Sequence, residues 1–267
     1  MKRYLTTIVF ALLMLTSAFA AFGQPTPAPA PNSLPFAAGE RLSFEGKINK
    51  FKLSVTIGDI VFEVADLTDQ TIRLKVDAES RGTMLKLFRY SFAQKIDTLA
   101  DARDLHAISS KKYDAQKQKV RDSVTNFDYG RKMVTWIETN PDEPTQPART
   151  IASDLPGPTY DAVTAVYYLR TLPLAVGYST TINISDSGLV YKVPIRVAAR
   201  ELQKTVLGEV WCWRVEPEIF GRGRIFGQKG SMQVWITDDV RRIPVRARVN
   251  AEVGKADIRL KETANLK

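Results

Sequence analysis

The sequence predicts a mainly β protein: a strongly curved antiparallel meander sheet, half-barrel or barrel-like, with one short helix packed on it. Three observations lead to this prediction. Apolar residues alternate with polar ones in many short runs, which is the period of a strand with one wet face. Turn-forming residues separate consecutive runs, so neighbouring strands are expected to pair antiparallel. A helical pattern between capping and terminating residues occurs at residues 161–170.

Residues 1–23 have the layout of a signal peptide. Lys2 and Arg3 precede an apolar run that ends in small residues around Ala18 and Ala20, and Gly23 closes a second cleavage-like triplet. This pattern places the mature chain in the periplasm or the medium. The alternative is an uncleaved membrane anchor, because the uncharged stretch approaches the roughly 20 residues that span a bilayer. We expect cleavage, and therefore no transmembrane segment in the mature chain.

The composition limits the classes of partner. The formal net charge is +9, and removal of Lys2 and Arg3 with the leader leaves +7. This charge favours a lipid or other amphiphile with an anionic headgroup, an anionic envelope polymer or an acidic envelope protein, and we expect no nucleic acid for a secreted chain. The single cysteine, Cys212, permits no intramolecular disulfide. It also lies far from the leader, so no N-terminal lipid anchor is expected.

A Pro/Ala-rich spacer is expected at residues 24–35, because prolines keep a chain extended and remove amide donors. A single β-rich domain is expected at 36–262, with a tail at 263–267. In its first strand Leu42, Phe44 and Ile48 share one face. Gly58 with Asp59 and residues 66–70 supply turns. Further alternating runs cover residues 51–57, 60–64, 72–76, 90–98, 105–113, 119–127 and 132–138.

Residues 139–158 contain many prolines, so we expect a long irregular connection there. The helix follows, with Thr159 or Asp161 as its cap and Pro173 and Gly177 beyond its end. Its apolar side is formed by Val163, Val166, Tyr167 and the aliphatic stem of Arg170. Because so short a helix is marginal alone in water, it must bury this side against the sheet.

The second half returns to alternating strands whose outer faces are basic. The outward arginines of these strands are Arg196, Arg200, Arg242, Arg246 and Arg248. A solvated face kept soluble by charge is favoured. The alternative is a positive stripe that the last three arginines form with Arg222 and Arg224.

Signals for catalysis are weak, and we expect no catalytic residue, metal site or cofactor. The only histidine, His106, lies in a strand pattern. Cys212 stands between two tryptophans and lacks the basic surroundings that activate a thiol. Residues 221–227 contain three glycines, but the third is one position late for a dinucleotide loop. Asp238 and Asp239 follow a strand, where a turn bonded to local amides and the following arginines is favoured.

Three segments resemble the DUF3108 family of uncharacterised bacterial envelope proteins: residues 36–44 (FAAGERLSF), 160–170 (YDAVTAVYYLR) and 234–245 (VWITDDVRRIPV). Gly58 also resembles a glycine of that family's first hairpin. The resemblance spans roughly residues 36–260 and implies a secreted, mostly β protein with no catalytic residues to carry over. In plan the strand-rich chain with one small helix is also similar to periplasmic carriers of the LolA and LolB type, which is an analogy of fold alone.

The leading hypothesis is a non-catalytic periplasmic protein that binds an apolar or amphiphilic envelope component in the curved sheet. Aromatic residues are available to line such a site, and the alternative is that they fill the core. These residues are Phe44, Phe51, Phe62, Trp211 and Trp213. A first alternative is an envelope interaction or assembly factor that uses the arginine-rich face. A second alternative is a hydrolase built from Tyr160, Asp161, Asp238 or Asp239.

Overall fold

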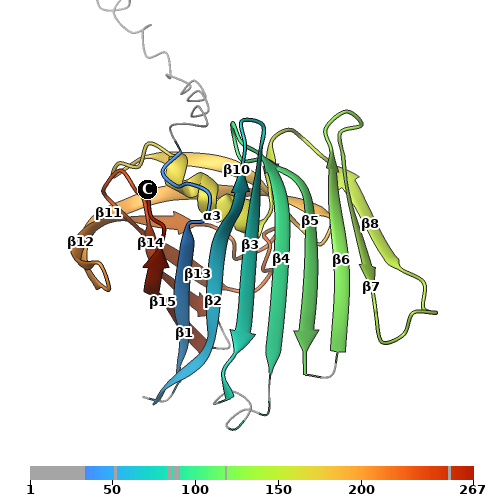
Figure 1. The fold of residues 1–267 in the computed structure, drawn as a ribbon, viewed down its shortest axis with the longest axis horizontal. Coiled ribbons are helices and arrows are strands. Elements are labelled where there is room, and N and C mark those ends of the chain that lie inside the picture. The colour runs from blue at the N-terminus through green and yellow to red at the C-terminus, as the bar shows by residue number, and fades with distance from the viewer. Residues whose placement is uncertain are drawn as a thin grey trace, which may run out of the picture.

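The computed structural model describes residues 34–50, 53–82, 86, 89, 91–117, 119–251 and 254–267. The predicted signal peptide and most of the predicted spacer lie outside the described residues, as does Phe51. Among the described residues the chain forms a 15-stranded sheet and the helix α3 (Ala162–Thr171). Figure 1 shows the sheet curving around the helix without closing into a barrel. The predicted fold class is therefore confirmed.

The strands follow the expected meander closely. Most alternating runs became strands, with boundaries shifted by a few residues. The strands are β1 (Arg41–Lys50), β2 (Leu53–Leu67), β3 (Thr71–Ser80), β4 (Phe92–Asp101), β5 (Ala107–Gln116), β6 (Lys119–Asp128), β7 (Met133–Thr139), β8 (Arg149–Asp154), β9 (Thr159–Tyr160), β10 (Ser179–Asp186), β11 (Leu189–Thr205), β12 (Gly208–Pro217), β13 (Gly230–Thr237), β14 (Pro244–Ala251) and β15 (Gly254–Ala264).

Two meanders meet at the middle of the sheet, where the first strand pairs with the last. The order is β8-β7-β6-β5-β4-β3-β2-β1-β15-β14-β13-β12-β11-β10-β9. β1 runs antiparallel to β15, with Leu42 opposite Thr263. At the outer end β9 pairs with β10 in parallel. Curvature brings the two ends of the sheet together, because β8 lies against β11.

The helix occupies the inner face of the sheet, which we define as the face that carries α3. Asp161 is its N-cap and accepts a hydrogen bond from the backbone N–H of Thr164, whose hydroxyl accepts one from the backbone N–H of Asp161 in return. This capping box satisfies amides that the first turn leaves free. The helix ends at the C-cap Leu172, before Pro173. It contacts β3, β4, β9 and β10.

The main core lies between α3 and the inner face. Val163 and Tyr167 of the helix pack there with Ile72 and Leu74 of β3. Leu34 and Phe36, which precede β1, belong to the same core. A second cluster contains Leu42 and Phe44, two of the three residues predicted to share a face of β1. Its members are Leu42, Phe44, Cys212, Trp235, Ile243, Val245 and Leu260.

The expected turn at Gly58 is wrong. β2 runs through Gly58, which lies opposite Gly46 of β1 beside a register shift. A Cβ at Gly58 would overlap the carbonyl oxygen of Glu79 and lie 3.0 Å from Cζ of Phe92. The glycine is therefore required by a close approach of neighbouring strands, not by a turn.

Two further expectations need correction. Residues 149–154, inside the segment expected to be irregular, form β8, because the prolines flank this stretch and do not interrupt it. Trp211 of β12, expected among the core aromatic residues, is 48% exposed, whereas its neighbour Cys212 is buried. Cys212 belongs to the second cluster, so that cluster covers the face of the strand opposite to Trp211.

Candidate ligand-binding cleft

A cleft of about 210 Å³ opens on the inner face beside the main core. Its floor is made by β4 to β7, and its walls by the N-terminus of α3 and by the turn between β10 and β11. The lining residues are Ile96, Ser110, Lys112, Asp114, Arg121, Ser123, Thr125, Phe127, Trp136, Glu138, Asp161, Ala162, Val163, Ser185, Asp186 and Ser187.

The floor is polar because β5 and β6 carry polar side chains on both faces. Ile96 of β4 lies opposite Lys112 of β5, which in turn lies opposite Ser123 of β6. Along a strand every second residue shares a face. The inner face therefore changes from apolar at β3, where Val76 faces the core, to polar at β5 and β6.

A chain of buried hydroxyls links the floor to the helix. Thr98 Oγ1 donates a hydrogen bond to Asp161 Oδ2 at 2.5 Å and lies 2.9 Å from Ser110 Oγ. Thr98 is fully buried, and Ser110 is 8% exposed. The other carboxylate oxygen of Asp161 caps α3, so this residue fixes the helix and the floor of the cleft together.

Both basic side chains of the cleft already have acidic neighbours within it. Lys112 Nζ lies 3.3 Å from Asp114 Oδ2. Arg121 Nε lies 3.8 Å from Glu138 Oε1. Each cation of the cleft is therefore paired with a carboxylate, and the cleft presents no isolated positive charge.

Ser185 of β10 is the unusual residue of the cleft. It is 7% exposed, and its Oγ has no hydrogen-bond partner among the described residues. Burying a hydroxyl without a partner is unfavourable, and a buried unpaired group in a folded protein commonly marks a place for water or a ligand.

The turn that follows Ser185 is held against β8 at the far edge of the sheet. Ser153 Oγ of β8 donates a hydrogen bond to the carbonyl oxygen of Gly188 at 2.7 Å. Gly188 has a φ of +80°, and a Cβ there would lie 2.8 Å from the carbonyl oxygen of Ile151 and 2.9 Å from Cβ of Trp136. Only glycine combines this backbone conformation with this close approach, so the turn is fixed as a wall of the cleft.

The residues proposed for a hydrolase do not converge at the cleft. Asp161 lines it, but Tyr160 is buried in the main core with its ring stacked on Tyr168 at 4.3 Å. Burial raises the pKa of Tyr160. Asp238 and Asp239 lie in the turn after β13 and are not among the lining residues.

The predicted turn at these two aspartates is observed. Asp238 pairs with Arg200 at 2.7 Å. Asp239 accepts hydrogen bonds from the side chains of Arg241 and Thr237 and from the backbone N–H of Arg241. Burial by itself would raise the pKa of Asp239, but these hydrogen bonds outweigh it and the pKa lies below its usual value.

The outward arginines of the second half, and Arg224, are largely neutralised by carboxylates. Arg248 instead lies over the ring of Trp235, 5.6 Å from its centre. The ion pairs are Arg196–Glu216 at 2.6 Å, Arg200–Asp238 at 2.7 Å, Arg224–Glu218 at 3.2 Å, Arg242–Asp238 at 3.9 Å and Arg246–Asp257 at 2.6 Å.

Most of the aromatic residues considered for a binding site pack in the core instead. Phe44 meets Phe62 edge to face at 5.7 Å between ring centres, and Trp213 packs against the main core. Trp211 is half exposed, with the Arg200 guanidinium 4.5 Å from the centre of its ring.

His106 and Cys212 are not among the residues that line the cleft. His106 Nδ1 lies 2.5 Å from Asp104 Oδ1, and its ring meets Tyr129 edge to face. Asp101, Asp104 and His106 lie close enough to hold a cation, but both oxygens of Asp101 already accept hydrogen bonds from Arg103. Burial, and then nearby carboxylates, raise the pKa of Cys212 to about 12.

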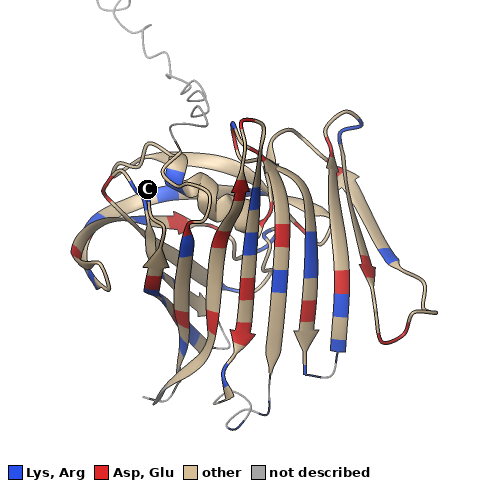
Figure 2. Cartoon of the chain, viewed as in Figure 1, with Lys and Arg blue, Asp and Glu red and all other residues tan. Residues whose placement is uncertain are grey.

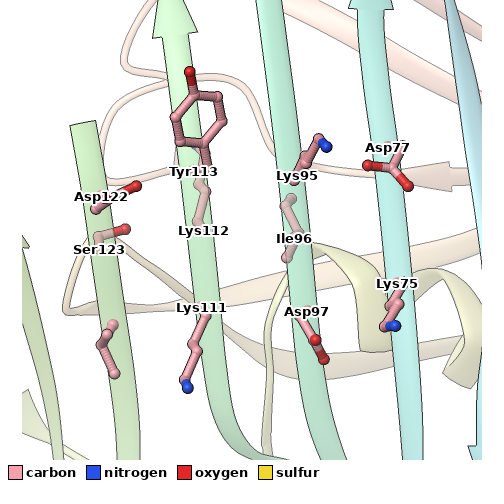
Figure 3. A pocket seen from close by; sticks show the side chains of 11 residues that line it. Lys75, Asp77, Lys95, Ile96, Asp97, Lys111, Lys112, Tyr113, Asp122 and Ser123 are labelled. Atoms are coloured by element: carbon pink, nitrogen blue, oxygen red, sulfur yellow. The ribbon is translucent and has the colours of Figure 1, made fainter. Parts of the chain in front are cut away.

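A larger depression of about 600 Å³ lies over β3 to β6 (Figure 3). Its charges compensate one another across the strands, since Asp97 lies opposite Lys75 on one side and Lys111 on the other. Arg73 also pairs with Asp97, at 2.6 Å. Figure 2 shows the same alternation of basic and acidic residues along β3 to β6. This surface is a solvated sheet face, so the smaller cleft is the stronger candidate site.

The sequence reasoning missed most of the cleft. The strand pattern alone does not indicate that Ser110, Lys112, Ser123 and Ser185 meet, because they come from three different strands. The signal was present in β5 and β6, where both alternating sets of residues are polar. A strand with two polar faces inside a large sheet indicates that one face lines a polar cavity.

Comparison with known proteins supports the fold and the family. The sequence profile of DUF3108, described as a protein of unknown function, matches residues 44–261. Among solved structures, a β-barrel-like DUF1849 protein from Brucella abortus has a TM-score of 0.58 at 10% identity, covering 86% of this chain and 98% of that one. A hypothetical protein from Chlamydia trachomatis has a TM-score of 0.34 at 7% identity, covering 90% and 94%.

No curated protein matches the chain in sequence. Within the described residues, no helix is long and apolar enough to cross a membrane. The similarity to the Brucella protein concerns the fold alone.

Proposed function

The chain belongs to the DUF3108 family, and on that premise we propose that it is a non-catalytic cell-envelope protein that binds a small polar ligand in the cleft. The observation that carries this proposal is Ser185, which lines a polar cavity and whose buried hydroxyl has no hydrogen-bond partner in the part of the chain that the structure describes. A ligand hydrogen-bonded to Ser185 would remove an energetic penalty of about 1–3 kcal/mol.

The ligand is placed in the polar cleft because the apolar part of the inner face is already filled. Tyr167 and Leu169 of α3, with Leu34 and Phe36 from the segment before β1, occupy it with the chain's own side chains. An apolar or amphiphilic ligand, as first expected, would have to displace the helix. A polar ligand needs no such rearrangement.

The envelope location rests on the leader. Lys2, Arg3 and the apolar run that follows have the layout of a signal peptide. We expect the protein in the periplasmic fraction, with a mature N-terminus after Ala20 or Gly23. Intact-mass measurement of the fractionated protein tests this, and a full-length chain in the membrane fraction would contradict it.

Native mass spectrometry of the protein purified from its own envelope tests the ligand. The released material is then extracted and identified. We expect a stoichiometric polar small molecule on the wild-type protein and its loss from Ser185→Ala. The same variant should unfold at a higher temperature when empty, because it no longer buries an unpaired hydroxyl.

Opposite results would reject the proposal. A stoichiometric lipid, held equally by the wild-type protein and Ser185→Ala, would restore the amphiphile hypothesis. An empty protein that no polar fraction of the envelope stabilises against heat would remove ligand binding altogether.

A further inference from the structure

We propose that the ligand is a neutral polyhydroxylated unit, the chemistry of a single sugar residue. This inference rests on the proposed function and adds the chemical class of the ligand to it. Three properties of the cleft support it: the direction of its buried hydrogen bonds, the pairing of its charges, and its size and lining.

The buried hydroxyl chain determines what Ser110 presents to the cleft. A hydroxyl has one proton to donate, and Thr98 donates its proton to Asp161. Ser110 must therefore donate to Thr98 across their 2.9 Å contact. The Ser110 oxygen is left with acceptor capacity on the side of the cleft, so the matching ligand atom carries an O–H or N–H donor.

The charges of the cleft argue against an anionic ligand. Lys112 and Arg121 already have Asp114 and Glu138 beside them, and Asp161 accepts hydrogen bonds at both of its oxygens. An anionic ligand would meet more carboxylates than cations here. In each pair the carboxylate can accept a hydrogen bond from one ligand hydroxyl while the cation donates a hydrogen bond to the next hydroxyl. Adjacent hydroxyls on a sugar ring suit this arrangement.

The lining also suits a ring with both polar and apolar surfaces. Several hydroxyls line the cleft, and Phe127 and Trp136 add apolar surface for C–H groups. These hydroxyls belong to Ser110, Ser123, Thr125, Ser185 and Ser187. A sugar ring matches this combination, because its hydroxyls project from a ring of C–H groups.

The size agrees with one ring. The volume of the cleft is about 210 Å³. It lies below the range of roughly 300–1,000 Å³ typical of sites for drug-sized ligands. Asp186 and Ser187 at the rim are exposed, so the bound unit can be a free sugar or the terminal residue of a longer glycan.

Saturation-transfer NMR on the full-length mature protein tests the ligand class. The neutral probes are glucose, galactose and N-acetylglucosamine, each also supplied as the terminal residue of a short oligosaccharide. The charged probes are glucuronic acid, glucosamine and glucose 6-phosphate, and a short-chain detergent represents amphiphiles. We expect at least one neutral sugar to bind, and to bind more tightly than its charged counterparts.

Matched variants place the binding in the cleft. Ser110→Ala should weaken the sugar about tenfold, the effect of losing roughly one hydrogen bond. Ser109→Ala is the control: it makes the same change one residue away, on the opposite face of β5. Ser123→Ala provides a second test in case Ser110→Ala disturbs folding, because Ser123 lines the cleft and is only half-buried.

The outcomes distinguish a failure of the sugar assignment from a failure of ligand binding itself. Tighter binding of a free sugar indicates a soluble ligand, and tighter binding of the oligosaccharide indicates a glycan end. If the occupant found by mass spectrometry depends on Ser185 but is charged or lacks hydroxyls, ligand binding stands and the sugar class is rejected. If no probe binds and no occupant is found, both proposals fail.

Discussion

Arg170 of α3 and Glu40, the residue before β1, form an ion pair in which both side chains are completely buried (0% exposed). Arg170 Nη1 lies 2.5 Å from Glu40 Oε1, and Nη2 lies 2.9 Å from Oε2. Nη2 also donates to the carbonyl oxygens of Pro35 at 3.2 Å and Arg241 at 3.0 Å. The pair therefore joins the helix to the segment before β1 and to the turn after β13.

Removing one partner of this pair should be strongly destabilising. Arg170→Met leaves the Glu40 carboxylate buried without its counter-ion, and Glu40→Gln leaves the Arg170 guanidinium in the same position. Breaking a buried pair in this way costs about 3–5 kcal/mol. Urea unfolding followed by tryptophan fluorescence measures the change in the free energy of unfolding.

The double variant and an exposed pair complete this test. Arg170→Met with Glu40→Leu should recover much of the loss, because no unpaired charge stays buried. Arg196→Met should cost less than about 1 kcal/mol, since Arg196 pairs with Glu216 at the surface. Similar losses for Arg170→Met and Arg196→Met would contradict this account of the buried pair.

Gly58→Ala should destabilise the sheet by about 1–3 kcal/mol, the usual cost of overpacking. The added Cβ would overlap the backbone carbonyl of Glu79, which cannot move without disturbing the pairing of β2 with β3. Gly227→Ala is the control, because nothing lies within 4 Å of the Cβ position there. Equal melting temperatures for the two variants would show that the close approach at Gly58 is not required.

The stability of the protein should fall in acid partly through Asp257. Burial by itself would raise the pKa of Asp257, but hydrogen bonds from Arg246 and Arg259 outweigh it and lower the pKa below its usual 3.8. A carboxyl with a depressed folded pKa contributes stability above its unfolded pKa and loses it as the pH falls through the folded pKa. Stability should therefore decline below about pH 4.

Asp257→Asn checks the assignment. Unfolding curves between pH 2 and 7 should show lower stability at neutral pH and a shallower decline in acid than in the wild-type protein. Asp142→Asn, at an exposed loop position, should leave both features unchanged. If the stability of Asp257→Asn falls in acid as steeply as that of the wild-type protein, other carboxyls cause the decline.

The Cys212 thiol should not react in the folded protein. Cys212 is buried, and burial followed by the charges of Asp239, Asp238 and Glu201 raises its pKa to about 12. Because the thiolate is the reactive form, Ellman's reagent at pH 8 should label the chain only after denaturant is added. Rapid stoichiometric labelling of the native protein would contradict both the burial and the raised pKa.

Local patterns predicted the elements well because their causes are local. Alternation of apolar and polar residues indicated β1 and β11, and the cap Asp161 with Pro173 beyond the end indicated α3. Gly58 was misjudged as a turn because the same residue also serves where strands approach closely, and the sequence does not distinguish these uses.

The sequence by itself determined the period of the strands, the start of the helix and the family. The tertiary structure decided which polar face is enclosed and which residues meet there. Thr98 reaches Asp161 across 63 positions, and Glu40 reaches Arg170 across 130. Such contacts depend on the pairing of β1 with β15 and on the curvature of the whole sheet, which arise from the summed packing of distant segments. For the same reason, only the tertiary structure shows that the Ser185 hydroxyl is buried with no hydrogen-bond partner among the described residues.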